Sequence, residues 1–463
     1  MQNWVESELA GVDLGDKRRE ARVRKLVDQL SQMPEGTFNQ ACPTPPDRKA
    51  AYRFFANKAV DPEAIGEAHR QSTWRRIERQ TGRVLVAQDT SSVDYSRHPR
   101  AQGLGPLETP GSQGYLIHSG LALSEQGEPL GLLHQQVWVR EEATRGQSEA
   151  RRKRPWSEKE SHKWQTTVEK VQAHRREGQT FVIIGDRESD VYGLLASPRP
   201  EGVELLVRSA QNRKVQAEAG LLHQALRKGP AAGQVRVEVG RAQERPARQA
   251  FCEVRFRKIT LLPPRHADAG VPKVPVTVWA VAIDELHPPK GETALRWVLL
   301  ATWPIERVEA AIEAAGFYSR RWLVERYHFV LKSGCRIEAS QLQEGKRLHR
   351  LETVYSIIAW RLLALTYQAR LHPQQSAEGL LERQEWQVVY AQQHQALPPK
   401  DMAPPSLGEV VQWIANLGGH WGRKGDAPPG VKVLWRGLTK LSGLVEGFLL
   451  AVSLLQAQDV GNG

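Results

Sequence analysis

The amino-acid sequence predicts an α/β protein: a mixed central domain that contains an all-β insertion, with helical domains at both ends. Three observations support this prediction. Apolar residues recur at helical spacing in the first 70 residues, short apolar runs typical of buried strands begin near residue 83, and alternating patterns typical of strands fill about 200–305. We therefore expect a helical domain at 1–70, a mixed domain at 71–370 and a helical domain at 371–463.

Composition narrows the class of partner. Lys and Arg total 64 against 52 Asp and Glu, which gives a net charge of +12. This excess favours a polyanionic partner such as nucleic acid, although a generally basic proteome would also produce it. The three cysteines are far apart and form no CxxC pair, which argues against a disulfide framework or a cysteine-rich zinc site and favours the reducing cytoplasm.

Neither end of the chain predicts a membrane segment. The N-terminal segment MQNWVESELAGVDLGDKRRE lacks the apolar core of a signal peptide. The most apolar stretch, GLVEGFLLAVSLLQA at 443–457, is too short to span a bilayer and carries Glu446. We therefore expect a buried amphipathic helix there, in a soluble cytoplasmic protein.

The first 70 residues are strongly basic. Helical periodicity is present in ARVRKLVDQLSQM and around AAYRFFANKAV, on either side of the proline-rich turn CPTPPD. Basic side chains crowd both helices: Arg18, Arg19, Arg22, Arg48, Lys49 and Arg53, with Lys17, Arg24 and Lys25 beside them. Such a unit is a plausible DNA-binding module; taken alone, a solvated helical face explains the pattern equally well.

Two apolar runs of the central domain each end in an aspartate: VLVAQ before Asp89 and FVIIG before Asp186. Side chains at the carboxyl ends of buried strands face the crevice where open α/β sheets bind ligands, and two carboxylates there suggest a divalent metal ion. The alternative is that each aspartate caps the turn after its strand. The neighbouring acids Asp94, Glu188 and Asp190 are further candidates.

The rest of the chain supplies the other elements in order. Two more strands are expected at YLIHSGLAL and PLGLLHQQVWV, then a charged mobile loop at EEATRGQSEARRKRPWSEKE and a helix at about 161–177. The insertion contains VRVEVG, FCEVRFRKI, VPVTVWAVAI and LRWVLLAT. Helices return from 306 to about 370, and the C-terminal helices are interrupted by LPPKDMAPPSLG.

The helix FYSRRWLVERYHFVLKSG carries a polar stripe of Tyr318, Arg321, Glu325 and Lys332. At about 100° per residue the stripe is roughly 60° wide and about 21 Å long, enough to span several phosphates. The opposite face can pack on a sheet: Phe317, Leu323, Val324, Tyr327, Val330 and Leu331. One acid between cations suits a metal ligand among phosphate contacts, but an ordinary ion pair between Arg321 and Glu325 has the same spacing.

The spacing Y-(2)-R-(3)-E-(6)-K in this helix resembles the signature of a large family of bacterial insertion-sequence transposases. The likeness is greatest to the cut-and-paste transposases of composite transposons that carry kanamycin resistance. It extends along the chain through LGDKRREAR, AYRFFANKAVDPEAI, QDTSSV, HSGLAL, GLLHQQVW, GDRESD, LLVRS, PPKGETALRWVLL and RLLAL.

The resemblance implies a ribonuclease-H-like catalytic core with a β insertion between the second and third acids. By position, Asp89, Asp186 and Glu325 correspond to the family's DDE triad. The resemblance also implies contacts with the transposon end, some of them gripping a flipped-out base, by Arg208, Trp297, Tyr318, Arg321, Trp322 and Lys332. One position departs from close relatives, which carry a lysine where this chain has Phe329.

The implied activity is metal-dependent DNA cutting and joining. Two Mg²⁺ ions per site, replaceable by Mn²⁺, would activate water and then a 3′-hydroxyl for attack on phosphorus. The family's steps are nicking, hairpin formation and opening, and strand transfer. The expected partners are double-stranded DNA, both transposon ends and target, and a second copy of the chain. The alternatives are a nuclease on the same core and a catalytically silent DNA-binding inhibitor.

Dimer formation is also expected from the apolar faces of SLGEVVQWIANLGG and GLVEGFLLAVSLLQA near the C-terminus. These faces are extensive enough to suggest an interface as well as a core. Packing within one chain is the alternative explanation.

Overall fold

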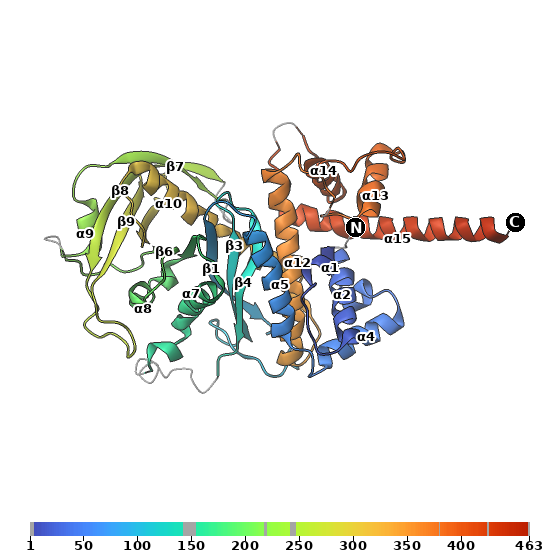
Figure 1. Ribbon diagram of the computed structural model, residues 1–463, viewed down its shortest axis with the longest axis horizontal. Helices are drawn as coiled ribbons and strands as arrows, with labels where there is room; N and C mark the ends of the chain where they lie inside the picture. The colour runs from blue at the N-terminus through green and yellow to red at the C-terminus, as the bar shows by residue number, and fades with distance from the viewer. Residues whose placement is uncertain are drawn as a thin grey trace.

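A computed structural model describes residues 4–141, 154–216, 220–240, 247–378, 380–423 and 426–461. Figure 1 shows a large sheet at one end of the molecule, helical units at the other, and one long helix between them. Most of the charged loop expected before the 161–177 helix lies outside the described residues.

Helices fill the N-terminal part of the chain, as the sequence predicts. They are α1 (Trp4–Glu8), α2 (Lys17–Gln32), α3 (Phe38–Ala41), α4 (Pro45–Ala56) and α5 (Pro62–Ile77). Asp16, Thr44 and Asp61 cap α2, α4 and α5 by accepting a backbone hydrogen bond in the first turn. A proline opens both α4 and α5, where its missing N–H costs nothing.

The sheet begins with strands in the order β4-β3-β1-β5-β6. They are β1 (Val84–Asp94), β3 (Gln113–Leu123), β4 (Pro129–Trp138), β5 (Phe181–Gly185) and β6 (Val203–Arg208), with the short β2 (Gly105–Pro106) at the end of β3. β1, β3 and β4 are antiparallel neighbours, whereas β1, β5 and β6 run parallel. The buried apolar runs therefore form the centre of the sheet.

The expected all-β insertion differs from the prediction in two respects. It contains a helix, α9 (Leu222–Arg227), and the strand β6 within its expected limits belongs to the parallel centre of the sheet. The predicted strands are present as β7 (Gly233–Val239), β8 (Arg248–Leu261), β9 (Val276–Glu285) and β10 (Arg296–Ala301). Because β10 pairs with β6, these strands extend the central sheet instead of forming a separate one.

Alternate residues of the central strands face two different cores. Val86, Ile183 and Leu205 pack on one side with α7 (Lys163–His174) and α8 (Tyr192–Ala196). Leu85 and Ile184 pack on the other side with the helical segment after residue 306. The sheet is thus covered by helices on both faces, the arrangement expected for parallel strands.

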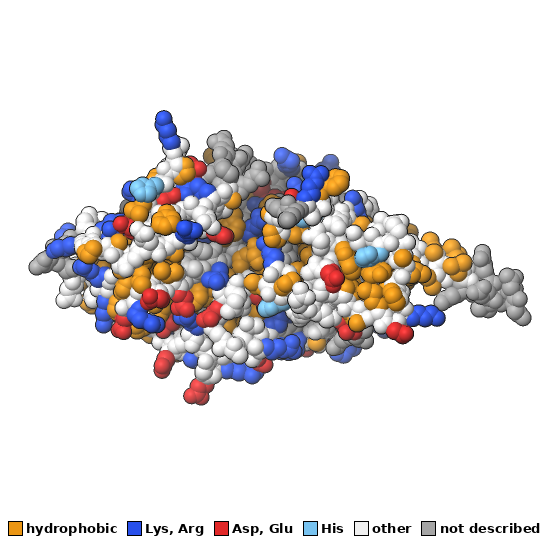
Figure 2. Space-filling view, turned by 90° about the horizontal axis from the view of Figure 1, so that it is seen from above, with side chains coloured by type: hydrophobic (Ala, Val, Ile, Leu, Met, Phe, Trp, Pro, Cys, Tyr) orange, Lys and Arg blue, Asp and Glu red, His pale blue; other side chains and the backbone are white. Residues whose placement is uncertain are grey.

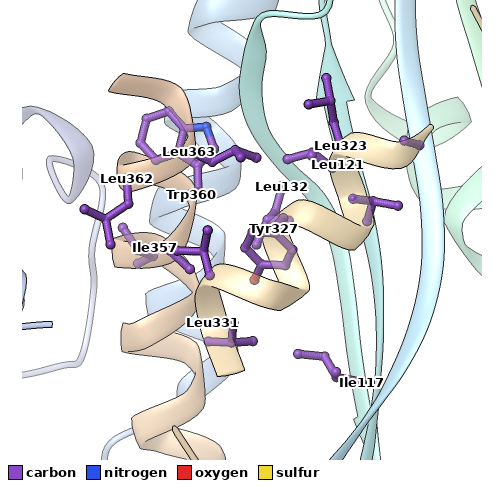
Figure 3. Packing of buried hydrophobic residues seen from close by; sticks show 14 of the residues in the cluster. Ile117, Leu121, Leu132, Leu323, Tyr327, Leu331, Ile357, Trp360, Leu362 and Leu363 are labelled. Carbon is purple, nitrogen blue, oxygen red and sulfur yellow. The ribbon is translucent and has the colours of Figure 1, made fainter. Parts of the chain in front are cut away.

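The helix predicted at 317–334 is broken into three parts. They are α10 (Val308–Arg320), α11 (Trp322–Phe329) and a π-helical turn, η5 (Val330–Gly334). Its apolar face packs as predicted: Tyr327 and Leu331 lie between Ile117 and Leu132 of the sheet and Ile357 of α12 (Gly345–Leu371) (Figure 3). The polar stripe is not continuous, because the π turn changes the helical rotation before Lys332.

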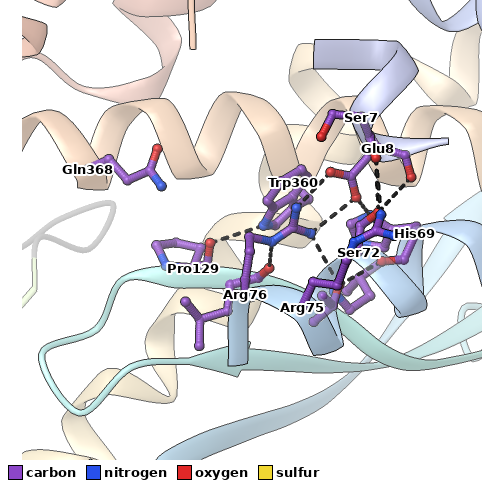
Figure 4. Close-up of polar contacts among 12 residues, drawn as sticks. Ser7, Glu8, His69, Ser72, Arg75, Arg76, Pro129, Trp360 and Gln368 are labelled. Carbon is purple, nitrogen blue, oxygen red and sulfur yellow. Dashed lines mark hydrogen bonds and ion pairs between the residues drawn. The ribbon is translucent and has the colours of Figure 1, made fainter. Parts of the chain in front are cut away.

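The N-terminal helices also pack against α12. Glu8 accepts hydrogen bonds from Arg76 at 2.7 and 3.1 Å and lies 2.5 Å from His69 Nδ1, while Arg76 stacks on the α12 residue Trp360 (Figure 4). Burial would raise the pKa of Glu8, but His69 and Arg76 outweigh it and lower this pKa to about 2. This buried cluster joins α1, α5 and α12.

The C-terminal helices have their own core, formed by α13 (Arg383–His394), α14 (Leu407–Leu417) and the first turns of α15 (Val431–Gly461). The rest of α15 projects from the body (Figure 1). Here the expectation of a buried helix is wrong: Leu450 and Leu455 are 61% and 62% exposed. Among the described residues, Val431–Leu455 is also long and apolar enough to cross a membrane by length and composition.

Candidate active site

Asp89 and Asp186 lie on neighbouring parallel strands. The pairing of β1 with β5 runs from Val84 opposite Phe181 to Ala87 opposite Ile184. Continued by two residues, this register brings Asp89 opposite Asp186. The expectation that both aspartates end their strands is right for Asp186, which follows β5, and wrong for Asp89, because β1 continues to Asp94 by pairing with β3.

Glu325 comes to the aspartates from α11. Its carboxylate accepts a hydrogen bond from Arg321, whose guanidinium also lies 3.7 Å from Asp89 Oδ1. The ordinary ion pair that the spacing allowed is therefore present together with the approach to Asp89. Asp186 likewise caps a turn, since its carboxylate accepts a hydrogen bond from the Glu188 backbone at 2.9 Å.

Negative charge is incompletely balanced in this cluster. Burial raises the pKa of Glu325, Arg321 opposes that rise, and Asp89 and Asp186 add to it. The pKa of Glu188 is raised by burial and by the same two aspartates, against the opposing charge of Lys163. Among the described residues no three His, Cys, Asp or Glu side chains are close enough to hold a metal ion. The repulsion between carboxylates nevertheless fits a hard cation, which would relieve it.

Two of the three acids, Asp89 and Glu325, line an open hollow of about 310 Å³. Asp89, Glu325, Phe329, Lys332 and Ser333 are among its walls. A larger groove of about 950 Å³ shares Lys332 and Ser333 with it and is also lined by Phe38 of α3 and Tyr52 of α4. The hollow and the groove are therefore neighbours that meet at Lys332 and Ser333.

The residues expected to contact a DNA end differ in accessibility. Tyr318 is buried, with its ring packed edge-on against Trp297 at 4.9 Å, whereas Trp322 is 50% exposed. Arg208 donates a hydrogen bond to the Arg296 carbonyl at 3.3 Å. The structure thus brings Tyr318 and Trp297 together and leaves Trp322 free to meet a ligand.

Lys332 is held near the acids by contacts with other elements, and not by its place in the predicted polar stripe. Its ammonium donates to the Ser92 carbonyl at 2.8 Å and lies 3.1 Å from Glu338. Phe329, the position that departs from close relatives, is 40% exposed at the mouth of the hollow.

The basic residues of the N-terminal helices fall into two groups. Arg18, Lys49 and Arg53 are exposed. The others have structural partners, which are the Ala59 carbonyl for Arg19, Asp47 for Arg22 and the Pro43 carbonyl for Arg48. The exposed group is therefore the better candidate for phosphate contacts.

Sequence reasoning missed His328, whose Nδ1 lies 3.3 Å from Asp89 Oδ2. The signal was its position one turn after Glu325, on the same side of a helix. Ser119, which lies opposite Asp89 in the β1–β3 register, was missed as well.

Comparisons with known proteins find matches at both ends of the chain. Residues 1–60 match the family model described as transposase DNA-binding. Residues 357–457 match the model described as Transposase Tn5 dimerisation domain. These matches support a DNA transposase that binds DNA and forms a dimer. More particularly, they support a place in the Tn5-like transposase family, while the Y-R-E-K signature stays a prediction.

One solved structure resembles the chain weakly. It is described as the cryo-EM structure of piggyBac transposase synaptic complex with hairpin DNA. The match has a TM-score of 0.36 and 8% sequence identity, and it covers 96% of this chain and 78% of that one. A score of this size does not establish a shared fold.

Proposed function

We propose that this protein is a cut-and-paste transposase of the DDE type, with Asp89, Asp186 and Glu325 as its acidic triad. The observation that carries the proposal is that Asp89 on β1 and Asp186, the residue after the parallel neighbour β5, both act electrostatically on Glu325 of a helix that packs on the same sheet. The matches to transposase families at both ends of the chain support the same reading.

A ribonuclease-H-like core forms part of the proposal. Its support is the strand order β4-β3-β1-β5-β6, with three antiparallel strands followed by two parallel ones. Helices on both faces and acids at the centre of the sheet fit that assignment. β7–β10 then form an extension that joins the core at β6.

The three carboxylates would hold two Mg²⁺ ions, or Mn²⁺ in their place. When bound, such ions lower the pKa of a nucleophilic water or 3′-hydroxyl and stabilise the leaving oxygen. Oxygen ligands select these hard cations over zinc.

The chain's own residues would orient the DNA. Lys332 and Arg321 supply positive charge beside the acids, and the groove shared with α3 and α4 offers a path for the DNA backbone. Trp297 and Trp322 supply aromatic faces on which an extruded base can stack, which would support a hairpin step. These roles, like the triad, are expectations for this chain.

The projecting part of α15 supports the proposed dimer. Its leucines and Phe448 are exposed on a helix within the segment that matches a dimerisation domain, and Figure 2 shows hydrophobic side chains where the projection leaves the body. A second copy of the chain would cover them. A nuclease acting alone would have no use for this apolar helix, which favours the transposase over that alternative.

The deciding experiment is DNA cleavage by single variants of the triad. We expect Asp89→Asn, Asp186→Asn and Glu325→Gln each to abolish nicking of DNA that carries the element's ends, because each removes one metal-binding charge. DNA binding, measured by gel shift, should persist. Glu309→Gln, at an exposed position in the first turn of α10, serves as a control that keeps activity. Nicking by any triad variant in the presence of Mg²⁺ would remove that residue from the triad.

A further inference from the structure

His328 lies beside Asp89 and is one of the residues that line the acidic hollow. It is 4% exposed and bridges two strands: its Nδ1 lies 3.3 Å from Asp89 Oδ2 on β1, and its Nε2 lies 3.1 Å from Ser119 Oγ on β3. Arg321 approaches the other oxygen of Asp89, Oδ1, at 3.7 Å. Each oxygen of the Asp89 carboxylate therefore has one of these two side chains beside it.

Ser119 is in turn held by a chain of polar groups behind the sheet. Gln135 Nε2 donates to Ser119 Oγ at 3.2 Å and to Tyr327 Oη at 2.9 Å. The Tyr327 hydroxyl also bonds Ser356, whose own hydroxyl donates to Glu352 at 2.6 Å. Apart from half-buried Gln135, these residues are buried.

The donor directions along this chain agree with one another. An amide group has two hydrogens, and Gln135 donates one to Ser119 and one to Tyr327. The Ser119 hydroxyl hydrogen is then available to His328 Nε2, which accepts it. The hydrogen on the ring must therefore be on Nδ1, where it is donated to Asp89. In each hydrogen bond the donor is the group nearer to Gln135. The chain ends at the Asp89 carboxyl group in one direction and at the Glu352 carboxyl group in the other.

We propose that His328 is a positioning residue that fixes the Asp89 carboxylate for metal binding, and that Gln135 and Ser119 set its tautomer. The inference rests on the proposed role of Asp89 as a metal ligand. A carboxylate ligand whose second oxygen is held by a rigid donor loses less freedom when it binds a cation. Loss of such an outer partner typically costs about 10–100-fold in metal affinity.

The test is Mn²⁺ binding by the full-length chain, with free Mn²⁺ measured by electron paramagnetic resonance. We expect His328→Ala to weaken binding by about 10–100-fold. His328→Asn should recover most of that loss, because its side-chain amide nitrogen replaces Nδ1 and can still donate to Asp89. Ser119→Ala removes the hydroxyl without a large cavity, and it should weaken binding because the ring is free to change tautomer.

A matched control separates positioning from stability. His134, on β4, is buried like His328, and its Nε2 has no hydrogen-bond partner in the described part of the chain. His134→Asn should change the melting temperature without changing Mn²⁺ affinity. Parent-like affinity in both His328→Ala and Ser119→Ala would overturn the inference, as would a loss in His328→Asn as large as in His328→Ala.

Asp89→Asn tells the two proposals apart. If it loses Mn²⁺ binding while the His328 and Ser119 variants keep theirs, the positioning role fails and the triad stands. If Asp89→Asn binds Mn²⁺ as the parent does, the metal-ligand role of Asp89 fails, and the inference about His328 fails with it.

Discussion

Glu352 is a carboxyl group with no exposed surface, at the end of the polar chain that runs from Gln135 through Tyr327 and Ser356. Burial raises the pKa of Glu352 to about 7, and the hydrogen bond from Ser356 only partly offsets it. The group therefore keeps its proton in the folded protein at a pH where the unfolded chain has already lost it.

This shift predicts a pH-dependent stability. Between pH 4.5, the ordinary value, and about 7, the folded state binds more protons than the unfolded state, so stability falls as the pH rises through this window. Glu352→Gln removes this loss. The free energy of unfolding of Glu352→Gln minus that of the parent should be about 3 kcal/mol larger at pH 8 than at pH 4.5. Urea titrations of both proteins at the two pH values measure this difference. An equal difference at both pH values would contradict the prediction.

Individual site residues show what sequence reasoning could reach. Asp186 was placed correctly because an apolar run ends where its strand ends. Asp89 was misplaced because the polar residues Thr90, Ser91 and Ser92 look like a loop, yet they continue the ladder opposite β3. The His328–Asp89 contact joins residues far apart in the sequence, and the only local indication of it is the position of His328 one turn after Glu325.

At the scale of elements, the buried Glu8 carboxylate strengthens the packing of the N-terminal helices on α12, with which they share an apolar core. We expect Glu8→Gln to lower the free energy of unfolding by about 3 kcal/mol, because Arg76 loses its buried partner. Glu6→Gln is the matched control, because Glu6 is half-exposed in its ion pair with Arg24. This substitution should lower the free energy of unfolding by less than about 1 kcal/mol.

The same pair predicts acid sensitivity. The folded-state pKa of Glu8 is about 2, below its ordinary value of 4.5. The stabilisation that the ionised Glu8 gives the folded protein is therefore complete above pH 4.5 and is lost as the pH falls towards 2. The stability difference between parent and Glu8→Gln should therefore shrink over this range in thermal melts. A difference that stays constant down to pH 2.5 would exclude the pair as its cause.

Helical periodicity identified most helices but not how they end or what they face. The predicted 317–334 helix has the right apolar face, yet its breaks at Arg321 and after Phe329 leave no mark in the pattern. The apolar residues of α15 were correctly read as a helix. Whether such a face packs inside its own chain or meets another molecule depends on tertiary contacts that periodicity does not contain.

The exposed face of α15 gives a direct prediction. Leu450 and Leu454 are 61% and 57% exposed and lie one turn apart. Leu450→Glu with Leu454→Glu should leave the fold intact, since neither side chain belongs to the core, and should turn a dimer into a monomer in analytical ultracentrifugation. The exposed position Glu446→Gln is the control. A variant that remains dimeric would place the interface elsewhere.

On the scale of the whole molecule, paired cleavage of two ends requires two copies of a chain with one acidic cluster. If each copy binds one end and cuts the other, a mixture of a binding-deficient chain and a cutting-deficient chain should recover DNA cleavage. We expect cleavage only when an Arg18/Lys49/Arg53→Ala variant is mixed with a Glu325→Gln variant. These three cations are chosen because they are exposed, whereas Arg19 and Arg22 hold the helices together.

Heterodimer formation must be demonstrated in that mixture, for example by two affinity tags on the two variants. A mixture in which heterodimers form and no DNA is cut would exclude cleavage in trans.

The pairing of β6 with β10 makes the outer strands difficult to remove. A chain shortened to end its sheet at β10 would expose the backbone groups that now bind β9 from Arg296 to Ala301. That bare edge, next to the buried residues Val298 and Leu299, is a template for strands of other molecules. Shortened versions of this protein that lack 209–295 should therefore aggregate. A stable short version would need either a new strand that covers this edge or charged side chains along it.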